Sequence, residues 1–246
     1  MRRLVPLLVF ALAAILARPV VAAEGVVLLH GLARSPRSLG KLEAELTRAG
    51  FVVVNLGYTS RSASIERLTD EALAAALADP RLQDCNRIHF VTHSLGGILL
   101  RSYVARHSLP HLGRVVMLGP PNQGSEVVDR IGHWRLFKFV NGPAGQELGT
   151  GADATPNRLG PVAFELGVIA GSRSINGINS LMIDGPDDGK VSIERTKVAG
   201  MKDHLVLPVT HPLMMTDEAV IAATLRFLAT GKFAAPAPDP TTGDTR

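Results

Sequence analysis

The sequence predicts an α/β fold in which a mostly parallel sheet of about six strands carries helices on both faces. Two observations support this prediction. Short apolar runs such as residues 26–29 are continuous rather than alternating with polar residues, which is typical of strands that are buried on both faces. These runs also alternate along the chain with segments whose apolar residues recur at helical spacing, and this order favours parallel strands joined by helices.

The separate elements follow from the same patterns. Strands are expected over residues 26–29, 51–56, 87–92, 114–118, 165–170 and 205–209. Helices are expected to begin at Ser35, Ile65, Leu95 and Thr216. Ser35 is a favoured cap and is followed by a proline, which suits the first position of a helix, and Gly50 ends that helix. Residues 120–159 are expected to be irregular.

The N-terminus has the layout of a secretory signal peptide. A positive Met1-Arg2-Arg3 precedes an apolar run over residues 4–16, and small residues end at Ala23. The run is short for a membrane span, which needs about 20 apolar residues. We expect residues 1–23 to be removed and the protein to be periplasmic or secreted; an uncleaved segment would make it membrane-anchored.

The rest of the chain has the length and composition of one domain, expected over residues 24–233, with a disordered tail over 234–246. Its single cysteine, Cys85, excludes an intramolecular disulfide, and no Cys/His cluster has zinc-ligand spacing. The net charge is +4 and the cations are scattered, which excludes an obvious nucleic-acid site and leaves weak attraction to an anionic lipid surface.

Ser94 is the strongest candidate for chemistry. It lies in Val91-Thr92-His93-Ser94-Leu95-Gly96-Gly97, between a buried strand and a helix with almost no loop. Such a turn presents the hydroxyl at the edge of the sheet, and the following glycines let the backbone pass closely. The plain alternative is a serine that caps the helix. Thr92 stands where a glycine is usual, so this β-branched residue must be accommodated by its neighbours.

A second motif, His30-Gly31-Leu32, follows the first strand. Acyl transfer develops a negative charge on the carbonyl oxygen, and two preorganised backbone N–H groups can stabilise it. The N–H groups of Leu32 and Leu95 are the candidates for this oxyanion hole.

A serine nucleophile needs a base, and five histidines follow it in the chain: His107, His111, His133, His204 and His211. Only His211 directly follows a predicted strand, at the carboxyl edge where Ser94 is expected, whereas His204 begins that strand and belongs to the opposite edge. The base needs a carboxylate partner. Asp184, Asp187 and Asp188 are candidates; we favour Asp188, with Asp184 as the rival.

The order Ser94, Asp188, His211 resembles that of α/β-hydrolases, and the chain is similar to small bacterial extracellular lipases and esterases and to the lipase-like group that includes glycosylphosphatidylinositol-inositol deacylases. The matching stretches are residues 28–32, 91–97, 119–125, 187–191 and 208–211. In that family the acid precedes Gly-x-Val, which selects Asp188. The resemblance implies a minimal version of the fold with six core strands and a variable cap over residues 120–159.

The cap segment holds an aromatic cluster, Trp134, Phe137 and Phe139, beside two cations. These aromatics are candidates to line an acyl pocket, which would favour short-to-medium fatty esters over charged substrates. A surface helix that packs on the core would explain them equally well.

The expected function is therefore hydrolysis of a small-molecule or lipid ester through an acyl-enzyme, with no cofactor and no metal. The same acyl-enzyme would serve an acyltransferase or a thioesterase. A binding protein or chaperone on an inactive hydrolase scaffold is the alternative outside enzymology.

Overall fold

The structure, a computed structural model, describes residues 23–234. The predicted signal peptide therefore lies outside the described residues except for Ala23, and the predicted tail lies outside them except for Ala234.

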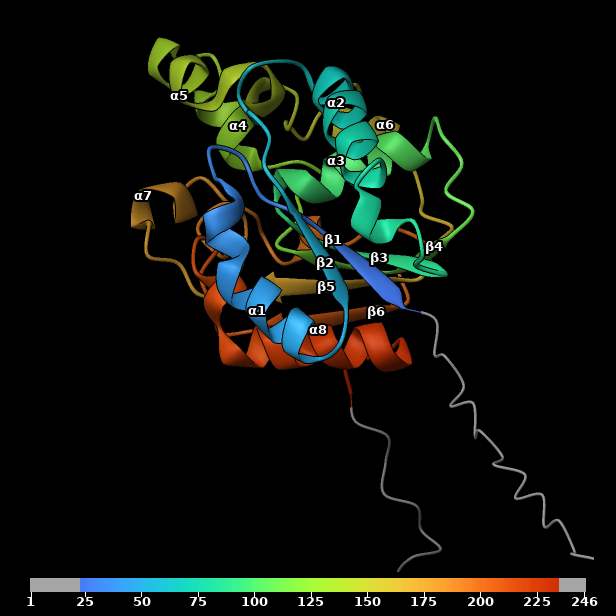
Figure 1. Cartoon of the computed structure of the whole chain (residues 1–246). Coiled ribbons are helices and arrows are strands. Elements are labelled where there is room, and N and C mark those ends of the chain that lie inside the picture. The colour runs from blue at the N-terminus through green and yellow to red at the C-terminus, as the bar shows by residue number, and fades with distance from the viewer. Residues whose placement is uncertain (1–22, 235–246) are drawn as a thin grey trace, which may run out of the picture.

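Six strands form one sheet in which every neighbouring pair is parallel, as the sequence predicted (Figure 1). Across the sheet the order is β2-β1-β3-β4-β5-β6. The strands are β1 (Glu24–Leu29), β2 (Val52–Leu56), β3 (Arg87–His93), β4 (Leu112–Leu118), β5 (Leu166–Gly171) and β6 (Asp203–Leu207). Because all six run in one direction, their carboxyl ends meet at a single edge of the sheet.

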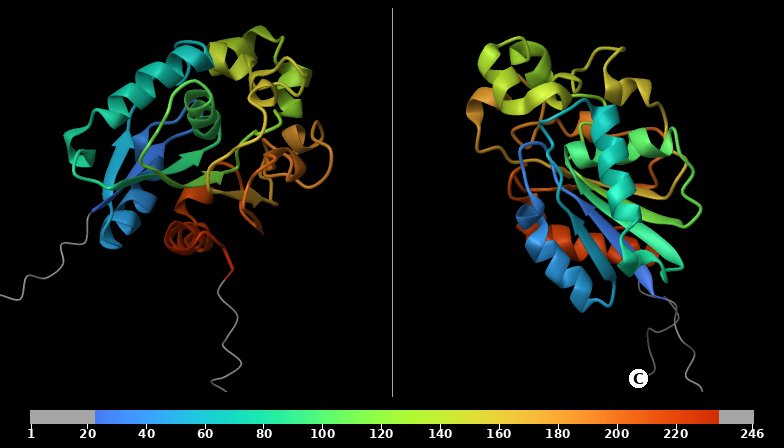
Figure 2. Two further views of the ribbon diagram at one scale, coloured as in Figure 1. Left: turned by 90° about the vertical axis from the view of Figure 1, so that its right-hand side faces the viewer. Right: turned by 45° about the horizontal axis from the view of Figure 1, so that its top comes forward.

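Alternation along the strands supplies two apolar cores, one on each face. In β1, Val26 and Leu28 belong to one core and Val27 and Leu29 to the other, because successive side chains of a strand point to opposite faces. Helices α1 (Gly40–Arg48) and α8 (Glu218–Thr230) cover the first face, and α2 (Ile65–Leu77) and α3 (Leu95–Val104) cover the second. Figure 1 and the left view of Figure 2 show these two layers.

The helix ends follow from local sequence. The Ser64 hydroxyl accepts a hydrogen bond from the Arg67 N–H and caps α2. The Asp217 carboxylate accepts from the N–H groups of Ala219 and Val220, so α8 begins after Asp217 rather than at Thr216 as predicted. Gly231 ends α8 in the left-handed region, with φ 76°.

The expectation that residues 120–159 are irregular is wrong. This segment folds into α4 (Glu126–Ile131), α5 (Arg135–Gln146) and α6 (Thr155–Arg158). Its helices are short, and α5 is broken at Gly142, which has φ 63° and is followed by Pro143. A Cβ at Gly142 would lie 2.1 Å from the Arg61 carbonyl oxygen. These interruptions hide the helical period that a continuous helix would show.

The remaining elements are short. They are the 3-10 turns η1 (Pro36–Leu39), η2 (Pro80–Leu82), η3 (Glu194–Thr196) and η4 (Met214–Thr216), and the single-turn helix α7 (Gly177–Ser180). Helices α5 and α7 lie at the same end of the molecule in all views (Figures 1 and 2). No helix within residues 23–234 is both long and apolar enough to cross a membrane.

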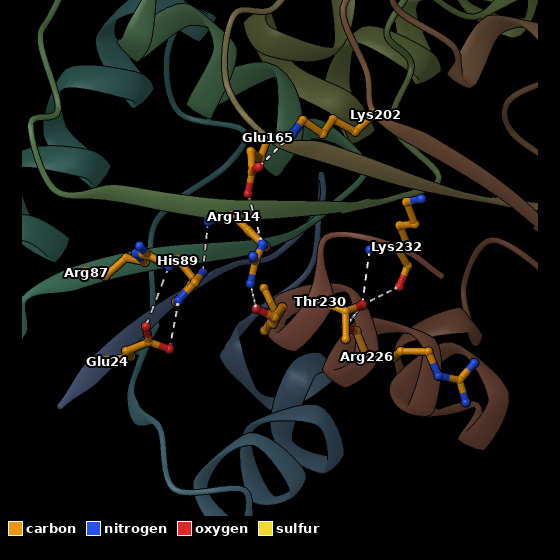
Figure 3. Close-up of polar contacts among 10 residues, drawn as sticks. Glu24, Arg87, His89, Arg114, Glu165, Lys202, Arg226, Thr230 and Lys232 are labelled. Carbon is orange, nitrogen blue, oxygen red and sulfur yellow. Dashed lines mark hydrogen bonds and ion pairs between the residues drawn. The ribbon is translucent and has the colours of Figure 1, made fainter. Parts of the chain in front are cut away.

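Charged side chains tie the strands together at their amino ends (Figure 3). The Arg114 guanidinium bridges the Glu165 carboxylate, 2.9 Å away, and the Leu228 carbonyl oxygen of α8, 2.7 Å away. Lys202 contacts the same Glu165 carboxylate. This network lies at the edge of the sheet opposite to the candidate site, so its contribution is to stability.

Candidate active site

Ser94 lies at the junction of β3 and α3 with a backbone that an L-residue rarely adopts. Its φ is 52° and its ψ is −120°, and its N–H donates to the Leu118 carbonyl oxygen at 2.9 Å, which holds the turn against β4. A non-glycine residue in this region costs about 1–3 kcal/mol and is concentrated at functional sites. Its hydroxyl does not cap α3, so the plain interpretation as a helix cap does not account for this serine.

Close packing explains the glycines that follow. A Cβ at Gly96 would lie 2.5 Å from the Leu29 carbonyl oxygen, so only glycine lets α3 approach β1 this closely. A Cβ at Gly97 would lie 3.2 Å from the Thr92 hydroxyl oxygen. Glycine at position 97 therefore leaves room for both the Met117 side chain and the fully buried, β-branched Thr92.

Asp188 and His211 form a buried pair. The His211 Nδ1–H donates to Asp188 Oδ2 over 2.7 Å, and the His211 backbone N–H donates to the Asp188 carbonyl oxygen over 2.9 Å. The other carboxylate oxygen, Oδ1, accepts from the N–H groups of Lys190 and Val191 at 3.0 and 2.9 Å. Asp188 is fully enclosed, and every part of its carboxylate is engaged.

The two rival aspartates lie elsewhere. The Asp187 carboxylate accepts from the Ser180 hydroxyl and the Gly189 N–H, which shapes the loop rather than the cavity. Asp184 is exposed, and its side chain makes no hydrogen bond among the described residues. Of the three carboxylates, the one that the Gly-x-Val pattern selected is the one beside His211.

Ser94 and His211 face the same cavity, but no hydrogen bond joins the Ser94 hydroxyl to the His211 ring. Serine–histidine hydrogen bonds are often long without substrate and tighten when it binds. The hydroxyl is partly accessible and has no other partner among the described residues. It is therefore available to a bound ester.

Two residues that the sequence did not single out hold the His211 pair in place. The His93 Nε2–H donates to the His211 carbonyl oxygen at 3.0 Å, and the two rings lie 4.7 Å apart between centroids. Burial lowers the pKa of His93 well below its usual value, and the nearby His211 lowers it further, so this ring is neutral. Gly119, with φ 53°, follows β4, and a Cβ there would lie 3.0 Å from Asp188 Oδ2 and 3.1 Å from His211 Nδ1.

Sequence signals existed for both positions. His93 immediately precedes the serine, and Gly119 ends a predicted strand beside a proline. Neither signal says which side chain the residue would meet, because the partners lie in the segments after β5 and β6.

Leu32 lies in the loop after β1 and lines the cavity. The Ala33 N–H donates to the Ser60 hydroxyl at 2.9 Å, the Arg34 N–H donates to the Gly31 carbonyl oxygen at 3.2 Å, and Ala33 has φ 55°. Within residues 23–234 the N–H groups of Leu32 and Leu95 have no hydrogen-bond acceptor. Neither N–H is therefore taken up by an acceptor of the described chain.

A cavity of about 720 Å³ opens over Ser94. Its apolar walls come mainly from the 120–159 segment: Pro121, Val127, Val128, Phe137, Val140 and Leu148. Of the three predicted pocket aromatics, only Phe137 lines it.

The assignment of Trp134 and Phe139 to the pocket is wrong. Trp134 precedes α5 with an extended backbone and is 55% exposed, so the three-residue spacing from Phe137 does not put them on one helical face. Phe139 is 83% exposed because it lies two positions after Phe137, and residues two apart on a helix point in different directions.

Within residues 23–234, no group of three or more histidine, cysteine, aspartate or glutamate side chains is arranged to hold a metal ion.

A parallel sheet with a strained serine after one strand and a histidine–carboxylate pair at the same edge defines a hydrolase of the α/β class. The chain belongs to the alpha/beta hydrolase family, whose profile matches residues 26–224. This confirms the resemblance and the fold class predicted from the sequence. A comparison with curated proteins finds no match.

Solved structures with this fold include lipases and esterases. The mature form of the lipase BlEst2 from Bacillus licheniformis is 20% identical, with a TM-score of 0.67 over 86% of this chain and 94% of that one. A lipase-esterase related protein from Clostridium acetobutylicum is 15% identical, with a TM-score of 0.54 over 83% and 94%. The phospholipase PlaB from Legionella pneumophila is 20% identical, with a TM-score of 0.57 over 71% of this chain but 46% of its own.

Proposed function

We propose that this protein hydrolyses carboxylic esters through an acyl-enzyme formed on Ser94. The Ser94 Oγ attacks the ester carbonyl carbon while His211 Nε2 takes the hydroxyl proton. The bond to the leaving alcohol then breaks, and His211 returns the proton to the alcohol oxygen. Water, activated by the same histidine, releases the acid and restores the serine.

Asp188 holds His211 in the tautomer that this reaction needs. Because Oδ2 accepts the Nδ1 proton, Nε2 is left with a free lone pair toward the cavity. As the imidazolium forms, the buried carboxylate stabilises its charge. The N–H groups of Leu32 and Leu95 are the donors for the oxyanion, and removing one such donor from an acyl-transfer site costs about 3–4 kcal/mol.

The observation that carries this proposal is the strained backbone of Ser94 at the mouth of an apolar cavity. The Ser94 hydroxyl has no structural role of its own, because it caps no helix and makes no hydrogen bond among the described residues. The strained turn does expose the hydroxyl to the cavity that Asp188 and His211 also line.

The test is Ser94→Ala, assayed with p-nitrophenyl butyrate and with a fluorophosphonate probe that reacts only with an activated serine. We expect both activities to disappear while the circular-dichroism spectrum and the Tm are kept. A chemically matched control is Ser108→Ala, because Ser108 is an exposed serine outside the lining of this cavity. Undiminished labelling of the Ser94 variant would refute the nucleophile, and a wild-type protein that neither labels nor hydrolyses would favour a binding protein.

We also propose that the cavity mouth contacts lipid surfaces. Large apolar side chains are exposed on both sides of it: Trp134, Leu136 and Phe139 near α5, and Ile175, Ile178 and Leu181 near α7. Residues 131–146 contain two cations and no acid, which suits an anionic surface. Sedimentation with phosphatidylglycerol vesicles tests this: Phe139→Ser should weaken binding, and equal binding by both proteins would contradict it.

Export remains a proposal that rests on the N-terminal sequence. A mature chain that begins at Glu24, measured by mass spectrometry of the exported protein, is the expected result. An intact Met1 in the membrane fraction would indicate an anchor.

A further inference from the structure

Two cationic side chains, Arg34 and Lys190, line the cavity that holds Ser94. Arg34 comes from the loop after β1, and Lys190 comes from the loop between β5 and β6 that also carries Asp188. The sequence separates them by more than half of the chain, and only the fold brings both to one opening.

Neither cation has an ion-pair partner among residues 23–234. This is unlike Lys41, Arg106 and Arg195, which each contact a carboxylate. The one acidic residue that lines the cavity is Asp188, and its two oxygens are already taken by His211 and by two backbone N–H groups. Asp188 is thus the one carboxylate beside two cations in the lining of this cavity, and its oxygens are already occupied by protein donors.

The backbones that carry the two cations are held firmly. The Arg34 N–H donates to the Gly31 carbonyl oxygen, and the preceding Ala33 is locked to Ser60. The Lys190 N–H donates to Asp188 Oδ1, and its carbonyl oxygen accepts from the Ser125 hydroxyl at 2.7 Å. Both side chains therefore start from fixed points on the rim.

The two charges lie on the lining of the same cavity, and this placement influences the pKa of Lys190. Partial loss of hydration lowers the pKa of Lys190; the Asp188 charge opposes this shift, and the Arg34 charge adds to it. The Arg34 charge also contributes to the lowered pKa of His93, which is caused mainly by burial. Two like charges at one opening repel each other, and an anion bound between them relieves that repulsion.

We infer that Arg34 and Lys190 form a subsite for an anionic group of the substrate, a phosphate or a carboxylate. This inference rests on the proposed ester hydrolysis at Ser94. A guanidinium presents paired donors that match the oxygens of phosphate and carboxylate, and the lysine adds a mobile charge. The apolar wall that includes Val128, Phe137 and Leu148 accepts the acyl chain of the same molecule.

The preferred substrate is thus an amphipathic ester with an acyl chain and a negative charge near the scissile bond. This proposal differs from the sequence-based expectation of a preference against all charged substrates. It favours anionic esters and disfavours only cationic ones, which Arg34 and Lys190 repel.

The experiment compares dibutanoylphosphatidic acid with dibutanoylglycerol, both as monomers in solution, on the full mature protein. The two have the same acyl chains and differ in the phosphate. We expect the wild-type kcat/KM to be higher for the phosphate ester, and the ratio to fall about tenfold in Arg34→Gln and in Lys190→Gln, since hydrogen bonds to charged groups are worth more than neutral ones. The wild-type ratio should also shrink as salt rises, because salt screens exposed charges.

Matched controls are Arg37→Gln and Lys232→Gln, which remove the same charges from exposed positions outside the cavity lining. They should leave the ratio unchanged. Equal wild-type rates on the two substrates, or a ratio that the two cavity variants do not alter, would overturn the subsite.

A second arm uses inorganic phosphate as an inhibitor of p-nitrophenyl butyrate hydrolysis. Inhibition that Arg34→Gln weakens supports the subsite when the phosphate ester is also preferred. Inhibition without that preference would assign the two cations to a free anion and overturn the substrate proposal. Ser94→Ala separates the two hypotheses. If this variant still hydrolyses both esters, the proposed function fails. If it hydrolyses neither ester and the wild-type protein shows a kcat/KM ratio of one, only the subsite is overturned.

Discussion

Asp188→Asn tests the candidate site most sharply, because the structure dictates how the new side chain must lie. Asp188 Oδ1 accepts two backbone N–H groups, from Lys190 and Val191. The amide oxygen of asparagine must take that position, since its NH₂ group cannot accept these bonds. The NH₂ group then points at His211 Nδ1, where the carboxylate stood 2.7 Å away.

A donor at that position reverses the histidine tautomer. Nδ1 becomes the acceptor and Nε2 carries the proton, so His211 can no longer take the proton of Ser94. In a serine-protease triad the same change lowers kcat about 10⁴-fold, which corresponds to about 5 kcal/mol of transition-state stabilisation. We expect a loss of that order, because Asp188 is fully buried and water cannot replace it.

The assay is kcat for p-nitrophenyl butyrate, with the Tm as a check that the fold is kept. Asp184→Asn is the matched control: that carboxylate is exposed and makes no hydrogen bond among the described residues, so its activity should stay near wild type. Asp187→Asn should cost less than Asp188→Asn, because it only loosens the loop held by Ser180 and Gly189. A larger loss in the Asp184 variant, or a mild effect at Asp188, would refute the reasoning.

Three further predictions concern the cavity, the core and pH. Phe137→Ala should lower the rates on longer acyl esters relative to short ones, because part of the acyl chain loses its burial. Each CH₂ that is no longer buried loses roughly 0.8 kcal/mol, which lowers the relative rate about threefold or more. Trp134→Ala should leave the relative rates unchanged. If the two variants depend on acyl length in the same way, the placement of Phe137 in the cavity wall is contradicted. Arg101 is buried in α3, where burial lowers its pKa to about 10, and it donates to carbonyl oxygens of the 120–160 segment. Arg101→Met should lower the free energy of unfolding by about 2–4 kcal/mol and the Tm by about 5–15 °C. The exposed Arg106→Met should lower the free energy of unfolding by about 1 kcal/mol or less. The pKa of His93 is lower in the folded state than in the unfolded chain, so the unfolded state takes up more protons below about pH 6.5. The free energy of unfolding should therefore fall there by up to about 1.4 kcal/mol per pH unit for this histidine. A Tm that stays flat from about pH 7.5 to about pH 5 would contradict this.

Local patterns were sufficient for the framework. Continuous apolar runs identified all six strands, and residues 87–92 differ from β3 by only the last position. The order of strands and helices then determined where reactive groups must gather, because the carboxyl ends of parallel strands share one edge. On this ground the sequence alone predicts a common site for Ser94 and His211.

Where several residues of one type stood close in sequence, spacing alone left the choice open. Asp184, Asp187 and Asp188 all lie in a single loop, and the geometry of the loop decides which carboxylate turns inward. The aromatics of α5 show the same limit. Phe137 lines the cavity while Trp134 and Phe139 face solvent, because the helix begins only after Trp134.

The sequence by itself determined the sheet, its helical layers and the residue types at the carboxyl edge, since each of these depends on hydrophobic period and chain order. The tertiary structure alone decided which distant side chains meet. Arg34 and Lys190 carry no signal in their own neighbourhoods, and each resembles an ordinary surface cation. They line one cavity with Ser94 because β1 and β5 end at the same edge of one sheet.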